Sequence, residues 1–249
     1  METPVKPTYF GIDGDIIVYR VGFASDKNED TLEGTLTGVK NALQDIINAC
    51  GEKSTIYLTG KGNFRFDLDP NYKGNRGDAG KPRFYQEIRD YMVDELGAVM
   101  VEGQEADDAL AIGAVQHGHG IATLDKDLDG CPGWHFNWVK DNIYYVSEVE
   151  ADRFFYTQML TGDATDNIPG LFKMVGKKAM PKIKAPLQEM TDPKEMYDYV
   201  YTVYCDGYED VGMCLGEMYE VVDAWLLRIG GCLWMRRKVN QMWEPPTNG

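Results

Sequence analysis

Short apolar segments alternate with helix-like stretches from Tyr9 to Val146, and this alternation is the strongest constraint on the fold. Helices are predicted around Val39–Ala49, over Pro82–Leu96 and from about Glu105. Strands that alternate with helices predict an α/β fold with a mainly parallel sheet. The segments with the length and character of strands are Tyr9–Ile12, Thr55–Leu58, Ala98–Val101, Gly120–Leu124, His135–Trp138 and Ile143–Val146.

The remaining sequence divides into a loop and a helical region. The stretch from Gly60 to Lys81 is rich in Gly, Asn and Lys, which predicts a mobile loop. After Glu148 the pattern is helical to about Ile229, with an interruption from Gly162 to Gly176. A chain of 249 residues can bury a substantial core as one α/β domain, or as one such domain with a small appendage.

The net charge of −15 argues against general nucleic-acid binding, but the basic residues are unevenly distributed. Six lysines and arginines lie between Lys61 and Arg83, against three acidic residues. Five lysines and no acidic residue lie between Leu171 and Gln188. Two local segments are therefore suited to phosphate groups despite the overall charge.

Neither a membrane location nor a disulfide framework is expected. No apolar run approaches the roughly 20 residues of a membrane-spanning helix, and the N-terminus lacks a signal-peptide pattern. The five cysteines are odd in number and never spaced CxxC. We therefore expect reduced thiols and a cytoplasmic protein without membrane contact.

Four groups of acidic residues follow or open apolar segments. Because the carboxyl ends of parallel strands meet at one edge of a sheet, we expect several of these groups to converge. Carboxylates that share a small volume cannot all ionise without a counter-charge, and Mg²⁺ or Mn²⁺ prefers such oxygen ligands. Two ions would activate a water and stabilise the leaving oxygen of a phosphoryl displacement. The groups are Asp13 with Asp15, Glu105 with Asp107 and Asp108, Asp125 with Asp127, and Asp163 with Asp166.

Each group alone also has a structural interpretation. Acidic residues at a helix start act as caps and interact favourably with the helix dipole, which would explain Glu105 and Asp107. Asp163 and Asp166 could cap a helix in the same way, and DGD after a strand is a common turn. Metal binding is favoured because the α/β interpretation places all four groups at or beside one edge of the sheet.

The order and spacing of five motifs resemble those of the flap endonucleases and 5′-3′ exonucleases, a family that includes the 5′-nuclease domain of bacterial DNA polymerase I and phage replication exonucleases. The resemblance spans residues 12–170, about two-thirds of the chain. The combination of YKGNR, EADD and GDxxDN is specific, whereas each motif alone is weak. The motifs are IDGDIIVYR (12–20), DPNYKGNR (69–76), QEADDALA (104–111), TLDKDL (123–128) and LTGDATDNIPG (160–170).

The resemblance implies a fold and a domain organisation. It implies a PIN-like catalytic α/β domain over residues 1–160, with an arch at about 60–95 over the site. Residues 161–249 would form a helical DNA-binding region packed on that domain, with a helix-three-turn-helix-like element that could also bind K⁺.

The resemblance also implies roles for individual residues. Lys73 and Arg76 match arch residues that meet the scissile phosphate, Tyr72 lies where a stacking side chain is expected, and Arg20 matches a basic residue beside the site. We expect Asp13, Asp107 and Asp125 to act in catalysis with Lys73 and Arg76, and Lys177 and Lys178 to bind substrate. The implied ligands of Mg²⁺ or Mn²⁺ are Asp13, Glu105, Asp107, Asp108, Asp125, Asp127, Asp163 and, as an outer ligand, Asp166.

The sequence departs from the family pattern at two places. Most relatives have another aspartate just after the second strand, where this chain has Gly60, so a water or Asp15 could fill that metal position. The DNA-gripping element usually reads IPGVxGIGxKTA, whereas this chain has IPGLFKMVGKKA with Lys173 near a usual glycine. The lysines of this segment remain suited to phosphate groups.

The resemblance predicts a metal-dependent 5′-nuclease acting on DNA with a 5′ end or flap, and on RNA–DNA hybrids, in the cytoplasm of a bacterium or phage-infected host. One rival is a haloacid dehalogenase-type phosphatase, with Asp13 as nucleophile and Asp15 as general acid. That interpretation leaves YKGNR, EADD and LDKD without a role. The other rival is a non-catalytic DNA-binding accessory protein, which Gly60 alone supports.

Overall fold

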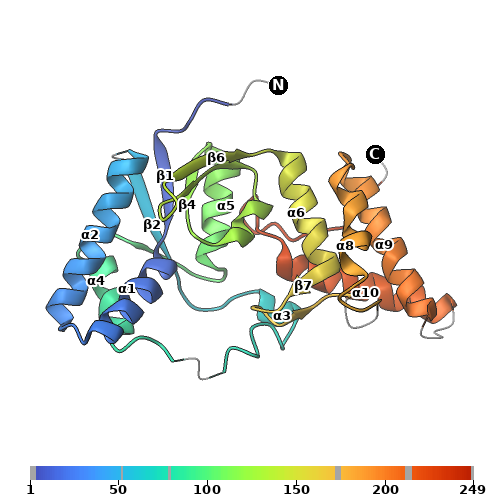
Figure 1. Cartoon of the computed structure of the whole chain (residues 1–249), viewed down its shortest axis with the longest axis horizontal. Coiled ribbons are helices and arrows are strands. Elements are labelled where there is room, and N and C mark those ends of the chain that lie inside the picture. Colours follow the sequence, from blue (N-terminus) through green and yellow to red (C-terminus); the bar gives the residue numbers. More distant parts are fainter. Residues whose placement is uncertain (1–3, 52, 78–79, 172–174, 211–214, 248–249) are drawn as a thin grey trace. The chain divides into compact units, whose positions relative to one another are not determined.

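The computed structural model describes residues 4–51, 53–77, 80–171, 175–210 and 215–247. The chain forms two compact units, which we describe separately (Figure 1). The first unit comprises Met1–Asn63, Asp78–Ser147 and Met235–Val239. The second comprises Phe64–Gly77, Glu148–Trp234 and Asn240–Gly249. Each unit therefore contains segments that are distant in sequence.

A six-stranded sheet forms the centre of the first unit, with strand order β3-β2-β1-β4-β5-β6. β1 pairs in parallel with both β2 and β4, and only the β5–β6 pair is antiparallel. This confirms the mainly parallel sheet predicted from the alternating segments. The strands are β1 (Tyr9–Asp13), β2 (Lys53–Thr59), β3 (Val99–Val101), β4 (Gly120–Ala122), β5 (Gly133–Asn137) and β6 (Asn142–Val146).

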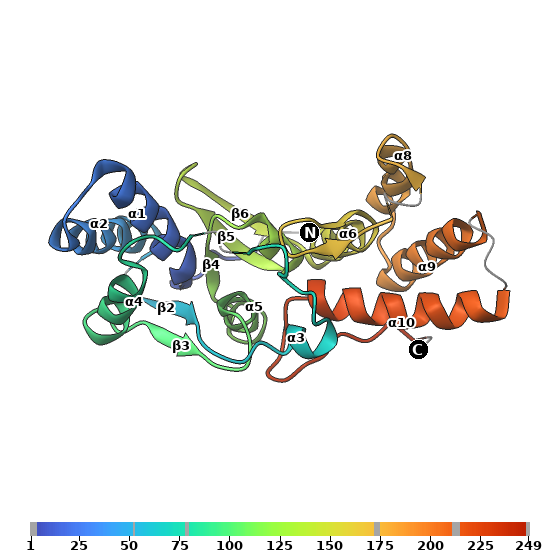
Figure 2. The same ribbon diagram turned by 90° about the horizontal axis from the view of Figure 1, so that it is seen from below.

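Helices cover both faces of this sheet (Figure 2). α1 (Gly14–Asn28), α2 (Leu32–Cys50) and α4 (Tyr85–Asp94) pack on one face, where Phe10 and Ile12 of β1 are fully buried. α5 (Ala106–His117) and the 3-10 helix η1 (Lys126–Gly130) pack on the other face, against Ile121. Because side chains alternate along a strand, each central strand packs against the helices on both faces of the sheet. The carboxyl ends of these strands therefore lie between the two helix layers.

The second unit is mainly helical, as predicted for the C-terminal region. Phe155, Met159, Val200 and Leu226 form part of its core. Arg65 is 1% exposed, and its guanidinium donates hydrogen bonds to the carbonyl of Cys232 in the last turn of the final helix and to that of Trp234 just beyond it. The elements are α3 (Arg65–Leu68), α6 (Glu148–Thr161), β7 (Gly162–Asp163), β8 (Ile168–Pro169), α8 (Met180–Lys184), η2 (Ala185–Gln188), α9 (Pro193–Asp210) and α10 (Leu215–Leu233).

The two compact units do not follow the boundary near residue 160 that was predicted for the domains. α6 belongs to the second unit because its apolar face packs in the same core as α9 and α10. Within the described part of the predicted arch, residues 64–77 form the four-residue α3 and turns, and α4 belongs to the first unit. Lys173 lies outside the described residues.

Among the residues described, no helix combines the length and the apolar character needed to cross a membrane. This finding is consistent with the mixed composition of α2, α9 and α10, which all carry acidic residues in the first turn.

We predict opposite effects of alanine at two glycines near helix starts. A Cβ atom on Gly14 would lie 2.7 Å from the carbonyl oxygen of Tyr57 and 2.9 Å from side-chain atoms of β2, so Gly14→Ala should destabilise the protein by about 1–3 kcal/mol. At Gly34 the nearest atom is the Thr31 hydroxyl oxygen at 3.5 Å, so Gly34→Ala should stabilise it by up to about 1 kcal/mol.

Chemical denaturation of both variants and the parent measures these changes. Equal stability of Gly14→Ala and Gly34→Ala would contradict the tight packing between α1 and β2.

Candidate active site

Asp13 lies at the point where β1 ends and α1 begins. Its carboxylate caps the helix, because Oδ1 accepts a hydrogen bond from the backbone N–H of Ile16 at 3.2 Å. Oδ2 accepts a hydrogen bond from the Thr123 hydroxyl at 2.8 Å. The side chain is only 2% exposed, so the turn after β1 presents a buried carboxylate rather than a solvated one.

Burial raises the pKa of Asp13 to about 7. This value includes smaller increases from the carboxylates of Asp15 and Asp125, and decreases from the hydrogen bonds of Thr123 and Ile16. Both charged neighbours that act on Asp13 are therefore acidic. A cation beside this group would favour its ionised form, which is the electrostatic condition of a metal-binding carboxylate.

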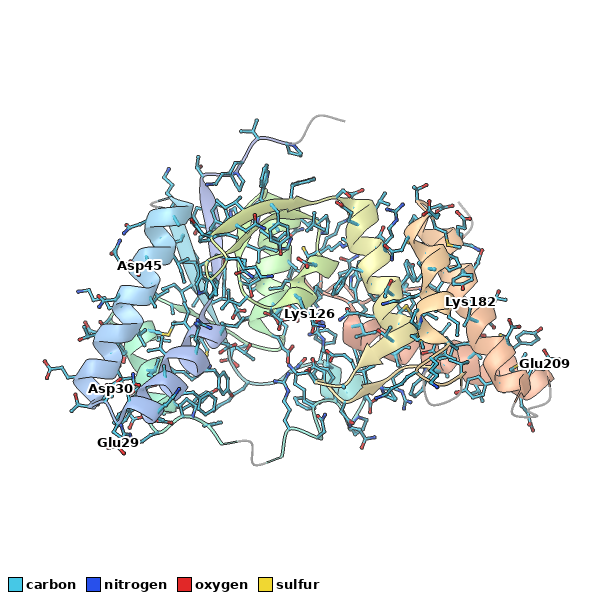
Figure 3. All side chains as sticks on the ribbon, in the orientation of Figure 1. Glu29, Asp30, Asp45, Lys126, Lys182 and Glu209 are labelled. Atoms are coloured by element: carbon cyan, nitrogen blue, oxygen red, sulfur yellow. The ribbon has the colours of Figure 1, made fainter. Side chains whose placement is uncertain are left out.

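Asp125 follows β4 and caps η1. Its Oδ1 accepts a hydrogen bond from the N–H of Asp127 at 2.9 Å, and its own N–H donates to the Thr123 hydroxyl oxygen at 3.0 Å. Thr123 therefore connects Asp125 to Asp13 across neighbouring strands. Lys126, labelled in Figure 3, is 82% exposed at its side chain, whereas that of Asp127 is 19% exposed.

Glu105, Asp107 and Asp108 stand at the N-terminus of α5. Glu105 is the N-cap, and its N–H donates to Asp108 Oδ2 at 3.2 Å within a capping box. Asp108 is fully buried, and its Oδ1 accepts a hydrogen bond from the N–H of Arg236 at 3.0 Å. Glu105 Oε1 accepts from the Asn63 amide at 2.9 Å, and Asp107 is half-buried in the first turn. Asp108 thus has a structural role in addition to its predicted role.

Asp15 is engaged by protein groups, which argues against the expectation that it replaces the missing aspartate. Its Oδ1 accepts a hydrogen bond from Arg89 at 2.7 Å, and its Oδ2 accepts one from the N–H of Thr59 at 2.9 Å.

Glu102 occupies the space beside Gly60. A Cβ atom on Gly60 would lie 2.6 Å from Glu102 Oε1, and Glu102 Oε2 accepts a hydrogen bond from the N–H of Lys61 at 2.7 Å. An acidic side chain is therefore present at this place, but it comes from the residue after β3 instead of the residue after β2.

The oxygen-rich donor set and the buried Asp13 fit a hard divalent cation such as Mg²⁺ or Mn²⁺. Among the described residues, however, no group of three His, Cys, Asp or Glu side chains is spaced to hold an ion. The suitability of this site for a divalent cation therefore rests on the oxygen chemistry and burial of the carboxylates, and not on ligands already spaced around an ion.

The second unit brings Asp166 together with the predicted phosphate-binding residues. Arg76 forms an ion pair with Asp166 Oδ1, and Lys73 Nζ lies 3.7 Å from Oδ2. The Tyr72 hydroxyl donates to Oδ2 at 2.8 Å. Tyr72 is only 2% exposed within the core of the unit, so the structure gives its ring a packing role in place of the predicted stacking on substrate.

Further hydrogen bonds hold the YKGNR segment against the GDATDN turn. The N–H of Lys73 donates to the carbonyl of Asp166 at 2.9 Å, and the Asn75 amide donates to the carbonyl of Ala164 at 2.6 Å. Asp163 Oδ1 accepts from the N–H of Thr165 at 2.8 Å. The two motifs, nearly 90 residues apart, thus form one local structure.

The remaining predicted substrate-binding residues lie at the surface. Lys177 and Lys178 are exposed before α8, where Lys182 is also labelled in Figure 3. Arg20 is exposed on α1 and lines a surface cavity of about 300 Å³ together with Asp45 and Trp138. The predicted grouping of Asp163 and Asp166 with the carboxylates of the first unit stays a prediction.

Several residues of the candidate site were not found from the sequence. Thr123 and Thr59 carry no charge, and their role depends on pairing across the sheet. Arg89 could have been noticed, because it is a charged residue beside Ile88 on the apolar side of a predicted helix. Glu102 gave no signal, since an acidic residue after an edge strand is common.

Comparison with known sequences finds related exonucleases, although no protein-family model matches the chain. The 5′-3′ exonuclease of Buchnera aphidicola (subsp. Schizaphis graminum) is 28% identical over 202 residues, covering 72% of this chain and 70% of that protein. The exonuclease of Escherichia phage T7 is 30% identical over 131 residues, covering 49% of this chain and 44% of the exonuclease. The match with the phage T7 enzyme thus spans less than half of its length.

Solved structures show the same fold. The T5 D15 protein, co-crystallised with metal ions, has a TM-score of 0.54 at 16% identity, covering 90% of this chain and 94% of its own. The catalytic core of Rad2, in complex with a DNA substrate, has a TM-score of 0.51 at 15% identity, covering 88% of this chain and 78% of its own. The chain is therefore similar in sequence to 5′-3′ exonucleases and shares the fold of these two structures, in agreement with the resemblance found from the motifs.

Proposed function

We propose that this protein is a divalent-metal-dependent 5′-nuclease that hydrolyses phosphodiester bonds in DNA. The observation that supports this function best is the buried Asp13 carboxylate, with acidic neighbours Asp15 and Asp125 at the carboxyl ends of parallel strands. Sequence relatives named as exonucleases support the same activity.

Within the first unit, Asp13, Glu105, Asp107, Asp125 and Asp127 are the proposed ligands of Mg²⁺ or Mn²⁺. Asp108 holds the start of α5 and would support the ligand set from behind. Asp163 and Asp166 are kept as predicted ligands from the second unit. Two bound ions would supply an activated water and charge stabilisation at the leaving oxygen.

Lys73 and Arg76 are proposed to bind the scissile phosphate. Both carry positive charge on a segment that hydrogen bonds hold in place, so a phosphate would meet preoriented cations. In the structure Asp166 pairs with both side chains. A phosphate dianion or monoanion would compete with Asp166 for the same cations, because both are oxygen anions.

The proposed substrate is duplex DNA with a 5′ end or 5′ flap, and RNA–DNA hybrids are a second candidate. Lys177 and Lys178 would contact the phosphate backbone, and K⁺ would bind near the DNA-gripping element. The protein would act in DNA replication in the cytoplasm of a bacterium or a phage-infected cell.

The geometry disfavours a phosphatase that uses Asp13 as nucleophile. Both Asp13 oxygens accept hydrogen bonds and the side chain is buried, whereas a nucleophile needs access to the phosphorus atom. Both carboxylate oxygens of Asp15 already accept hydrogen bonds, from Arg89 and from the N–H of Thr59, so the side chain is not turned towards a substrate as a general acid would be.

Cleavage of 5′-labelled DNA tests the proposed function directly. A flap duplex and a blunt duplex should release short 5′ products with Mg²⁺ but not with EDTA, and Asp125→Asn should lose this activity. Turnover of p-nitrophenyl phosphate with intact DNA would favour the phosphatase, and neither activity would favour the accessory protein.

Lys73 and Asp125 have different predicted roles, so their variants should differ in the effect on Mg²⁺ binding. Lys73→Ala should lower the cleavage rate by on the order of a hundredfold, because it removes charge from the transition state, with Mg²⁺ binding nearly intact. Asp125→Asn should lower both the cleavage rate and the affinity for Mg²⁺. Isothermal titration with Mg²⁺ and single-turnover cleavage measure the two effects, and equal loss of Mg²⁺ binding in both variants would contradict the assignment.

The raised pKa of Asp13 predicts a pH-dependent stability that needs no activity assay. Between pH 3.8 and about 7 the native Asp13 keeps a proton that the unfolded chain has released, so its burial costs more stability as the pH rises. Asp13→Asn keeps the cap and lacks this cost. Without divalent metal, the melting temperature of Asp13→Asn relative to the parent should therefore rise from pH 4 to pH 8.

Mg²⁺ provides the control for this stability prediction. At pH 8 it should raise the melting temperature of the parent more than that of Asp13→Asn, because an ion replaces the proton as counter-charge. Parallel curves for the two proteins with and without Mg²⁺ would exclude Asp13 as a ligand.

A further inference from the structure

Arg89 is a buried arginine on α4 of the first unit. Its side chain is 7% exposed, and the adjacent Ile88 is fully buried. A guanidinium in such surroundings is costly unless its charge and donors are matched. Arg89 donates one hydrogen bond to Asp15 Oδ1 at 2.7 Å and another to the carbonyl of Thr59. It therefore connects α4 to the start of α1 and the end of β2.

Hydrogen bonds continue from this pair to the start of α5. Asp15 Oδ2 accepts from the N–H of Thr59 at 2.9 Å, and the Thr59 hydroxyl oxygen accepts from the N–H of Ala106 at 2.9 Å. Ala106 lies between Glu105 and Asp107, and Asp15 lies two residues after Asp13. A continuous network thus joins the segments that carry the candidate carboxylates on both sides of β2.

We propose that Arg89 is a positioning residue for the cleavage reaction, and this inference rests on the proposed function. Arg89 holds Asp15 against the end of β2, and through Thr59 it sets the place of the α5 N-terminus relative to Asp13. The planar guanidinium suits this task because it binds a carboxylate and a carbonyl at the same time in fixed directions.

Arg89 has a second effect, which is to balance charge. Without it, Asp15 would be another uncompensated anion beside Asp13 and would be free to turn towards a bound cation. In a variant without Arg89, the affinity for metal would therefore stay equal or increase, while the metal ligands would no longer be held in the positions that cleavage requires. A residue with a purely structural role would instead lower metal binding and rate together, in proportion to the lost folded fraction.

A set of variants on this network distinguishes the two roles. The set comprises Arg89→Met, Arg89→Lys, Asp15→Asn and the double variant Asp15→Asn/Arg89→Met, with Asp90→Asn as a control because Asp90 is exposed on the same helix. Electron paramagnetic resonance measures Mn²⁺ affinity of the DNA-free protein, and single-turnover cleavage of a labelled flap duplex at saturating Mn²⁺ measures the rate.

Arg89→Met should cleave roughly ten- to a hundredfold more slowly than the parent with equal or tighter Mn²⁺ binding, since small misplacements of reacting groups have such effects. The cleavage rate of Arg89→Lys should lie between those of the parent and Arg89→Met, because lysine keeps the positive charge but lacks the planar guanidinium that binds two acceptors at once. The double variant should match Asp15→Asn to within about twofold, because Arg89 has no carboxylate left to hold. Asp90→Asn should match the parent.

Three results would overturn the inference. These are a parental rate in Arg89→Met, parallel losses of rate, Mn²⁺ binding and melting temperature, or a double variant clearly slower than Asp15→Asn. If Arg89→Met does not fold, Arg89→Lys against the parent and the double variant against Asp15→Asn decide the matter. A parent that cleaves no DNA would refute the proposed function itself, which separates the two failures.

Discussion

The carboxylate of Asp13 holds the start of α1 and the end of β4 at the same time, and the arrangement of the candidate site depends on this pair of contacts. One oxygen caps the helix through Ile16, and the other accepts the hydroxyl of Thr123, which also receives the N–H of Asp125. β1 lies between β2 and β4, so Asp13 stands at the end of a central strand of the sheet. Burial above all, and then the neighbours Asp15 and Asp125, make an ionised carboxylate unfavourable at this position in the absence of a cation.

Helix capping and metal binding are compatible explanations for these acidic residues. Asp13, Glu105 and Asp125 each stand at an N-cap, where the helix end has a partial positive charge. The cap reduces the repulsion between carboxylates and restricts their directions before an ion binds. The capping role of each acidic group thus explains how the site can be assembled. Asp108 is an exception, because both of its oxygens accept hydrogen bonds from backbone N–H groups, those of Glu105 and Arg236.

The sequence predicted the features that follow from local patterns. Strand and helix alternation gave the parallel sheet, and the acidic residues after β1 and β4 lie at the strand ends as expected. Features that depend on packing between distant segments were missed. The space beside Gly60 is filled by Glu102, which follows another strand, and the ring of Tyr72 is buried by a core formed about 80 to 170 residues later in the chain. Neither is encoded in local periodicity.

The pairing of Lys73 and Arg76 with Asp166 bears on how an acidic chain would present cations to phosphate under the proposed function. At a net charge of −15, distant charges disfavour DNA, but screening limits their influence to about 8 Å at physiological salt. The charged groups next to Lys73 and Arg76 therefore matter more for phosphate binding than the net charge of the chain. Asp166 keeps the two cations oriented in the absence of DNA, with Tyr72 fixing the carboxylate from the core side. Under the proposed function, a phosphate that displaced Asp166 would meet side chains already in place, which would reduce the entropic cost of ordering two flexible cations.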